Sequence, residues 1–278
     1  MANKSELPPD RYALIGHPVG HSRSPLIHGL FARQTGQKLT YELIDAEPPS
    51  FATAVRGFGA AGGRGLNVTV PHKEAAFELA DEVSEAASKA HAVNTLSFNG
   101  TRLRGDNTDG VGFLRDVTIN QRQPIAARTV LILGAGGAAR GIVGPLLEAS
   151  PRDLVVANRT FERAEQVVEA FREHRQIRAI PFSGLEELAP FDIVINATSA
   201  GLNGDAPPFP GTLIGPHTFC YDLVYSLNDT PFVAWARGHG AERALQGWGM
   251  LVEQAAESFL IWRGVRPDTA PILKQLVR

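Results

Sequence analysis

The feature that most constrains the fold of this chain is the segment RTVLILGAGGAAR at residues 128–140. Its apolar run at 130–133 is typical of a buried strand, and a helical pattern begins after the glycines. Gly134, Gly136 and Ala139 fill the three small positions of a dinucleotide-binding turn. The first permits a tight turn, the second lets a pyrophosphate come close, and the third lets the helix pack on the strand.

The surroundings of this turn support the same interpretation. A helical pattern follows at 138–149, with Pro145 inside it as a candidate kink, and a second strand is predicted at 153–158. The start of the helix offers free backbone N–H groups and a positive dipole end to phosphate. A lone glycine fingerprint is weak evidence, but this context favours nucleotide binding over an ordinary glycine turn. The residues expected at the cofactor are Gly134, Ala135, Gly136, Gly137 and Ala138.

The end of the second predicted strand indicates which dinucleotide binds. An NAD-binding fingerprint usually has Asp or Glu there for the ribose 2′-hydroxyl. Here the strand ends Asn158-Arg159-Thr160, and Arg163 follows one helical turn later. A single surface arginine is more often a solvated charge, but two guanidiniums at this place can pair with a 2′-phosphate. We predict that the cofactor is NADP(H).

Composition excludes several classes of protein. With 278 residues, 44% of them hydrophobic, the chain can bury a core large enough for two domains. A net charge of −2 shows no basic excess for nucleic acid. No apolar run approaches the ~20 residues that span a membrane, and the start lacks the apolar region of a signal peptide. We expect a cytoplasmic protein whose partner is a small molecule.

Cysteine and histidine usage points away from disulfide and metal chemistry. The single cysteine, Cys220, excludes an internal disulfide and suits a reducing cytoplasm. It lies in an apolar run at 219–224, so we interpret it as a small core residue rather than a nucleophile. The eight histidines are scattered without metal-ligand spacing, and no metal site is predicted.

The first hundred residues form a second unit that precedes the glycine turn. Alternating strands and helices indicate an α/β unit rather than a tail. Strands are predicted at 12–15, 41–45, 66–70, 92–98 and 102–104, and helices at 25–34, 51–58 and 71–80.

Three polar segments of this unit are candidates for a site. In HSRSP at 21–25, Ser24 is predicted to cap a helix that begins at Pro25. Capping alone explains Ser24, but it does not explain Ser22. Two hydroxyls beside free helix N–H groups would also bind a carboxylate.

In the second segment, NVTVPHKE at 67–74, Pro71 marks the expected first helical turn and Lys73 lies at the helix N-terminus. A cation there opposes the helix dipole by ~0.3–1 kcal/mol. This position favours loss of the proton and so suits an acid–base lysine. The alternative is an exposed lysine neutralised by Glu74.

The third segment, GDNTDG at 105–110, precedes a helix predicted at 110–117. Asp109 could simply cap that helix. The segment lacks the later Glu and the alternating ligands of a calcium loop. Local sequence does not separate a cap from a catalyst at this position.

Taken together, these segments resemble the shikimate dehydrogenase family. Matching blocks occur in family order and cover essentially the whole chain, with small departures at Leu227 and Trp248. The blocks are HSRSP at 21–25, NVTVPHKE at 67–74, AVNT at 92–95, GDNTDGVG at 105–112, GAGGAAR at 134–140, NRT at 158–160, INATSAG at 195–201, YDLVY at 221–225 and GMLVEQAAESF at 249–259.

The resemblance implies an α/β fold of two domains. An N-terminal α/β substrate domain with a mixed sheet would comprise 1–108 and 250–278. A doubly wound Rossmann NADP-binding domain would comprise 109–249, with the C-terminal helices returning to the first domain. The sequence agrees, since helices are predicted at 251–263, after a glycine-rich hinge at 247–249, and at 271–276.

The resemblance also implies the activity, which is reversible NADPH-dependent reduction of 3-dehydroshikimate to shikimate in aromatic amino acid biosynthesis. Hydride arriving at a carbonyl carbon leaves negative charge on the oxygen, which must be stabilised and protonated. Lys73 and Asp109 match the family's catalytic pair. We expect Lys73 to be the direct partner of the oxygen and Asp109 to orient it and share its proton.

Other site residues follow from register with the family. Ser22 and Ser24, helped by Tyr225, match residues that bind the substrate carboxylate. Ring hydroxyls need fixed partners, because an unpaired polar group costs ~1–3 kcal/mol. The positions that match such partners are Thr69, Asn94 and Gln254, although Asn94 alone reads as a turn residue and Gln254 as an exposed helix residue.

On the cofactor side, the resemblance implies contacts from the second half of the chain. Thr198, within Ala197-Thr198-Ser199 after an apolar strand at 193–195, would form a wall for the nicotinamide ribose. Gly247 and Met250 are expected near the nicotinamide. A methionine that only fills the core would give the same sequence pattern as Met250.

Two alternatives remain open. The chain could be a quinate/shikimate dehydrogenase paralogue that uses NAD, which the Asn158-Arg159 ending and the paired serines oppose. It could also be a non-catalytic NADP-sensing protein on the same scaffold, but a sensor needs neither Lys73 nor Asp109. As an assembly we expect a monomer or a homodimer.

Overall fold

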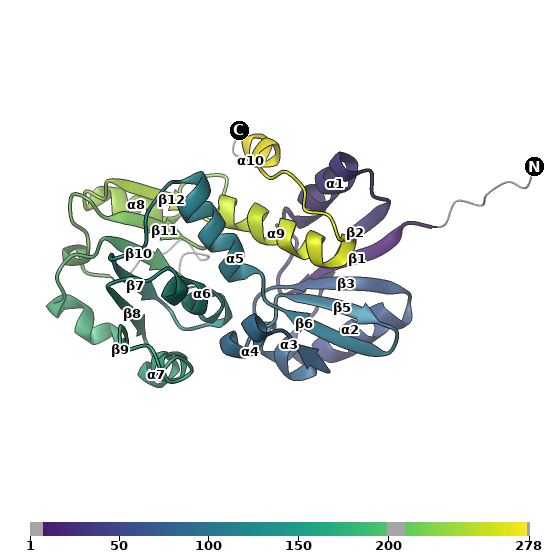
Figure 1. The fold of residues 1–278 in the computed structure, drawn as a ribbon, viewed down its shortest axis with the longest axis horizontal. Helices are drawn as coiled ribbons and strands as arrows, with labels where there is room; N and C mark the ends of the chain where they lie inside the picture. Colours follow the sequence, from purple (N-terminus) through teal and green to yellow (C-terminus); the bar gives the residue numbers. More distant parts are fainter. Residues whose placement is uncertain (1–7, 199–208, 277–278) are drawn as a thin grey trace, which may run out of the picture.

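The computed structural model describes residues 8–198 and 209–276. Figure 1 shows two lobes, each built on a six-stranded sheet. Two helices, α5 (Asp109–Leu114) and α9 (Trp248–Arg263), lie between the sheets and pack on each other. In the described ranges no helix is both long and apolar enough to cross a membrane.

The first sheet is mixed, as predicted. Its strand order is β2-β1-β3-β5-β6-β4. The strand β1 pairs in parallel with β2 and β3, whereas β5 is antiparallel to both β3 and β6. The bounds are β1 (Asp10–Gly16), β2 (Leu39–Asp45), β3 (Gly63–Val68), β4 (Glu82–Val83), β5 (Thr95–Asn99) and β6 (Arg102–Asp106).

Helices cover both faces of the first sheet. Apolar side chains of α2 (Phe51–Ala60), α3 (Lys73–Leu79) and α4 (Glu85–Ala90) form a core on one face. On the other face α1 (Ser24–Thr35) packs with α9 and α10 (Ala270–Leu276). The predicted return of the C-terminal helices to the first lobe is therefore confirmed.

The second sheet is wholly parallel, with the order β12-β11-β10-β7-β8-β9. The first strand of this lobe, β7, lies centrally and the chain winds outward from it on both sides, which is the doubly wound arrangement. The bounds are β7 (Thr129–Leu133), β8 (Asp153–Asn158), β9 (Ile177–Pro181), β10 (Ile193–Asn196), β11 (Phe219–Asp222) and β12 (Arg243–Gln246).

The helices α6 (Gly137–Glu148) and α7 (Phe161–Glu169) pack on one face of this sheet, and α8 (Pro231–Gly238) packs on the other. Pro145 lies inside α6. Cys220 is buried in the core, as predicted, and burial raises the pKa of its thiol to about 12.

Three local predictions were wrong. Ser24 is the first residue of α1 rather than its cap, since Arg23 occupies the N-cap position, and the Ser24 N–H donates to the Ser22 hydroxyl. The helix α3 begins at Lys73 rather than at Pro71. The expected hinge at 247–249 is mostly helical, since α9 begins at Trp248.

Glu253 of α9 is the centre of a buried ion cluster, and its side chain is only 2% exposed. It accepts hydrogen bonds from Arg115 and Asn120, each at 3.1 Å, on the wider π-helical turn that continues α5. It also accepts from Arg266 at 2.6 Å and Thr269 at 2.7 Å, ahead of α10. The cluster ties α5, α9 and the C-terminal segment together.

We expect Glu253→Gln to lower the free energy of unfolding by about 2 to 3 kcal/mol at neutral pH, since hydrogen bonds to a charged group are lost. Burial raises the pKa of Glu253, but the four hydrogen bonds outweigh it, so the folded-state pKa is below 4.5. Because its pKa is lower in the folded state, the Glu253 carboxylate stabilises the fold at pH values above its unfolded-state pKa. This stability is lost as the pH falls through the folded-state pKa.

Denaturant titrations over a range of pH would check this prediction. The difference in free energy of unfolding between wild type and Glu253→Gln should become smaller at acidic pH. As a control, Glu257→Gln removes a carboxylate one turn later that pairs with Arg266. It should cost less than about 1 kcal/mol. A difference in free energy of unfolding that is the same at all pH values would contradict the lowered pKa of Glu253.

Candidate active site

Lys73 and Asp109 meet although they are 36 residues apart. Each is the first residue of its helix, α3 and α5. Lys73 Nζ lies 2.5 Å from Asp109 Oδ2, and the two side chains are 12% and 5% exposed. Asn94 Nδ2 donates to the other carboxylate oxygen at 2.9 Å. The N-cap position belongs to Thr108, so Asp109 is free of a capping role and its carboxylate is held by two donors.

Asn94 connects this pair to α9. Its Nδ2 lies 3.3 Å from Gln254 Oε1, and its Oδ1 accepts the backbone N–H of Thr108 at 2.9 Å. Asn94 is buried and Gln254 is half-buried, so neither fits the alternative of an exposed turn or helix residue. Segments from both ends of the chain thus converge beside Asp109.

The two predicted serines also lie together, and Tyr225 reaches them from the other lobe. Ser22 Oγ and Ser24 Oγ are 3.1 Å apart. Burial raises the pKa of the Tyr225 hydroxyl, and a hydrogen bond with Ser22 partly offsets this rise. The Tyr225 ring packs on Trp248 with ring centroids 4.7 Å apart. Thr69 lies on the loop between β3 and α3, with its N–H donated to Ile15.

Sequence reasoning missed two residues that join these groups. Asn67 Nδ2 donates to Ser258 Oγ at 2.8 Å, and Tyr41 donates its hydroxyl to Asn67 Oδ1 at 2.7 Å. Burial raises the pKa of Tyr41 far above its usual value, partly offset by a hydrogen bond with Ser24. Asn67 was visible as a polar residue inside a buried strand, whereas a tyrosine in a strand carries no local signal.

The glycine turn has the shape that a pyrophosphate requires. Gly134 has φ +112°, and an added Cβ would lie 2.9 Å from the backbone of Ala197 and 3.1 Å from Thr198 N. A Cβ on Gly136 would meet nothing within 4 Å, so this residue faces open space. The helix α6 begins at the next residue, and its first N–H groups lack partners within the helix. These residues fit a dinucleotide.

The Lys73–Asp109 pair lies at the mouth of this turn. A Cβ on Gly137 would stand 3.0 Å from Lys73 Cβ. One helical turn later, a Cβ on Gly141 would stand 3.1 Å from Asp109 Cβ. Lys73 and Asp109 therefore lie directly against the first two turns of α6.

Gly137→Ala is expected to lower kcat by about tenfold, because the new methyl displaces Lys73 by a few tenths of an ångström. Steady-state kinetics would measure the effect. Gly144→Ala is the matched control on the same helix, since its methyl would face Phe171 instead. Equal kcat values in the two variants would contradict the contact with Lys73.

The end of β8 carries the arginines expected for the 2′-phosphate. Arg159 and Arg163 are exposed, and neither forms an ion pair with any residue that the structure describes. Asn158 is tied to Thr160 through a hydrogen bond of 2.8 Å from its Nδ2 to the carbonyl. Both guanidiniums are thus available to an anion.

The remaining predicted cofactor residues lie on the loops and helix that border the turn. Ala135 is buried and Ala138 is half-buried in the first turn of α6. Thr198 hydrogen-bonds Asn196 Oδ1 at 2.7 Å, while Ser199 lies outside the described residues. Gly247 is the N-cap of α9, and Met250 is buried in the core of the second lobe.

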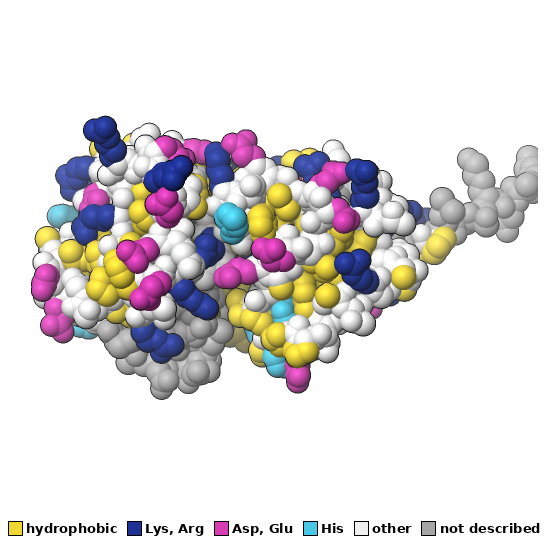
Figure 2. All heavy atoms as spheres, turned by 90° about the horizontal axis from the view of Figure 1, so that it is seen from below, with side chains coloured by type: hydrophobic (Ala, Val, Ile, Leu, Met, Phe, Trp, Pro, Cys, Tyr) yellow, Lys and Arg dark blue, Asp and Glu magenta, His cyan; other side chains and the backbone are white. Residues whose placement is uncertain are grey.

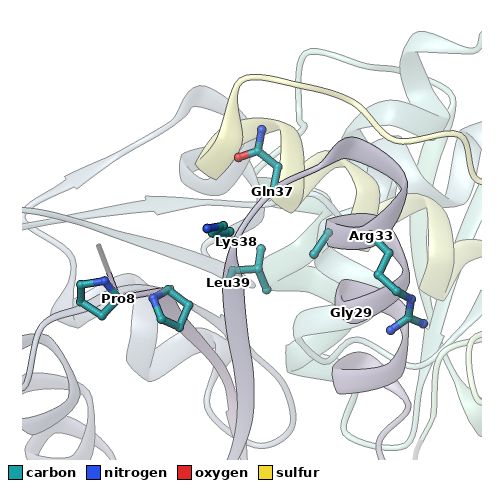
Figure 3. A pocket seen from close by; sticks show the side chains of 8 residues that line it. Pro8, Gly29, Arg33, Gln37, Lys38 and Leu39 are labelled. Carbon is teal, nitrogen blue, oxygen red and sulfur yellow. The ribbon is translucent and has the colours of Figure 1, made fainter. Parts of the chain in front are cut away.

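The surface carries mixed charge and a hollow that lies apart from the predicted site residues. Figure 2 shows Lys and Arg interspersed with Asp and Glu on one face. A hollow of about 590 Å³ lies beside α1 and β2 (Figure 3) and contains none of the predicted site residues. Within 8–198 and 209–276, no three His, Cys, Asp or Glu side chains are grouped to hold a metal ion.

Family models match three parts of the chain. The shikimate dehydrogenase substrate binding domain matches residues 14–96, the shikimate/quinate 5-dehydrogenase model matches 118–203, and the shikimate 5′-dehydrogenase C-terminal domain matches 247–277.

Relatives match over nearly the full length. A shikimate dehydrogenase (NADP(+)) from Alkalilimnicola ehrlichii is 53% identical, over 96% of this chain and 98% of that protein. The crystal structure of an Ael1 enzyme from Pseudomonas putida has a TM-score of 0.87 at 46% identity, covering 97% and 98%. Shikimate 5-dehydrogenase from Thermus thermophilus, in complex with NADP(H) and shikimate, has a TM-score of 0.84 at 35% identity, covering 95% and 97%. This chain belongs to the shikimate dehydrogenase family.

Proposed function

We propose that the protein is an NADP-dependent shikimate dehydrogenase, which reversibly reduces the ketone of 3-dehydroshikimate to the hydroxyl of shikimate. The observation that carries the proposal is the Lys73–Asp109 pair, held against the glycine turn at Gly137. The curated relatives with about half of their residues identical are named for this activity.

When bound, NADPH supplies the hydride. The developing negative charge on the substrate oxygen is stabilised by the Lys73 ammonium, which then donates its proton to that oxygen. Asp109 orients the ammonium through their hydrogen bond, while Asn94 holds the second carboxylate oxygen in place. In the reverse direction Lys73 and Asp109 together accept the proton of the hydroxyl, and the two share it as a coupled pair.

The substrate carboxylate is assigned to Ser22 and Ser24 with the help of Tyr225. The adjacency of the three hydroxyls supports this role. Thr69, Asn94 and Gln254 are assigned to the ring hydroxyls. The position of Asn94 between Asp109 and Gln254 supports binding of the substrate ring by the side-chain amides of Asn94 and Gln254.

The cofactor is assigned to the turn and the end of β8. Gly134 to Ala138 would face the pyrophosphate, and Asn158, Arg159, Thr160 and Arg163 would bind the 2′-phosphate through charge-assisted hydrogen bonds. Thr198, Gly247 and Met250 would surround the nicotinamide. The exposed guanidiniums and the open space at Gly136 support this placement.

The two functions divide between the lobes. Residues 1–108 and 250–278 would form the substrate domain, and 109–249 the NADP-binding domain. We propose that the protein works in the cytoplasm as a monomer or a homodimer.

The deciding experiment follows the absorbance of reduced nicotinamide in the presence of purified protein, shikimate and NADP. Rapid reduction of NADP is expected. Faster turnover with quinate and NAD would favour the paralogue, and no turnover despite NADPH binding would favour the sensor and refute the proposal.

A further inference from the structure

A second buried polar cluster lies where α9 begins. Asp116, in the π-helical turn Arg115–Asn120, is 1% exposed. Its Oδ2 accepts the hydroxyl of Tyr221 at 2.7 Å, and its Oδ1 accepts from Asn120 at 3.0 Å. The same tyrosine oxygen accepts the backbone N–H of Met250 at 3.2 Å.

Tyr221 supplies a hydrogen-bond acceptor for a backbone N–H in the first turn of α9, where the helix itself offers no acceptor. The first N–H groups of a helix have no intrahelical acceptor, and Met250 lies in the first turn of α9. Burial raises the pKa of Tyr221 far above its usual value, and the charge of Asp116 adds to the effect. The phenol therefore keeps its proton and can donate to Asp116 while it accepts from Met250.

The close approach of α9 to Asp116 depends on the lack of a side chain at Gly249. A Cβ on Gly249 would overlap the Asp116 carboxylate. With glycine there, three elements meet at one point: the π-helical turn that continues α5 from Asp109, β11 of the second sheet, and α9, which also carries Gln254. This cluster joins the first turn of α9 to the helix that begins at Asp109, as the Glu253 cluster does further along α9.

We propose that Tyr221 is a positioning residue: with Asp116 it holds the first turn of α9, and hence Met250, in register with Asp109. This inference rests on the proposed function and on the place of Met250 beside the nicotinamide. Tyr221 acts only through the elements that it holds together.

Tyr221→Phe in the full-length protein tests the proposal. The ring still packs edge-on against Phe113, with centroids 5.3 Å apart, so the change is confined to the hydroxyl. We expect kcat to fall by about 10- to 100-fold, because a small misplacement of reacting groups has effects of this size. The KM for shikimate should stay within about threefold of wild type. The Kd for NADPH, measured by tryptophan fluorescence, should also stay within about threefold.

Tyr12→Phe is the matched control. Tyr12 is also buried, and its hydroxyl accepts from Arg263 at 3.2 Å in the last turn of α9. Both variants should show a lower unfolding midpoint, but only Tyr221→Phe should lose kcat. Should Tyr221→Phe fail to fold, Asp116→Asn weakens the same hydrogen bond and is expected to lower kcat in the same way.

Unchanged kcat in a folded Tyr221→Phe protein, or an equal loss in Tyr12→Phe, would overturn the positioning role. A loss of turnover that disappears at saturating NADPH would overturn it as well, because weaker cofactor binding would then explain the loss. An inactive wild-type protein would instead refute the proposed function on which the inference rests.

Discussion

Lys73→Ala is expected to lower kcat by about 100- to 10,000-fold, which is the usual contribution of a positioned acid–base group. The substrate oxygen would lose its proton donor, and Asp109 would keep only the hydrogen bond from Asn94 among the two that hold its carboxylate oxygens. NADPH binding should persist, because the phosphate contacts lie on the other lobe. Stopped-flow turnover and a fluorescence titration with NADPH would measure the two effects separately.

Lys89→Ala is a suitable control for that experiment. Lys89 is an exposed lysine of the same lobe that pairs with Glu85 across one helical turn. Its removal should leave kcat unchanged. Turnover of Lys73→Ala close to that of Lys89→Ala would rule out Lys73 as the acid–base group.

The combined variant Arg159→Ala, Arg163→Ala is expected to raise the Kd for NADPH by about 100-fold. A hydrogen bond to a charged group contributes about 1.5–3 kcal/mol, and each 1.4 kcal/mol is a factor of ten. NADH lacks the 2′-phosphate, so its binding should change little. The preference for NADPH over NADH should therefore fall by about the same factor as the NADPH affinity.

Arg172→Ala controls for the general loss of positive charge on this lobe, because Arg172 is exposed and pairs with Glu169. Kd values for both cofactors at two salt concentrations would complete the test. An equal loss of NADPH and NADH binding in the double variant would show that the arginines do not read the phosphate.

The strongest sequence predictions were those in which one local requirement decides the structure. The φ of +112° at Gly134 needs glycine whatever surrounds it, so the strand–turn–helix was predictable. The core strands were predictable from apolar runs, within about three residues at their ends. The two lobes and the returning helices followed from resemblance to the family.

Predictions failed where distant contacts decide. Glycines at 247–249 suggested a hinge, but α9 begins at Trp248, and Tyr221, 29 residues away along the chain, accepts the N–H of Met250 in its first turn. The helix α4 was overlooked although Ser84 caps it, since six residues give little periodicity. For Asp109, local sequence left cap and catalyst open. In the structure Thr108 occupies the N-cap position, and Lys73 of another helix contacts the Asp109 carboxylate.

A crystal structure with NADP and shikimate bound would test the proposed site most directly. We expect the nicotinamide carbon about 3–3.5 Å from the reacting carbon of shikimate. We also expect Lys73 Nζ within about 3 Å of the substrate oxygen, with Asp109 still beside it. Shikimate bound away from the glycine turn, or a Lys73 ammonium turned from the substrate oxygen, would contradict the acid–base role of Lys73.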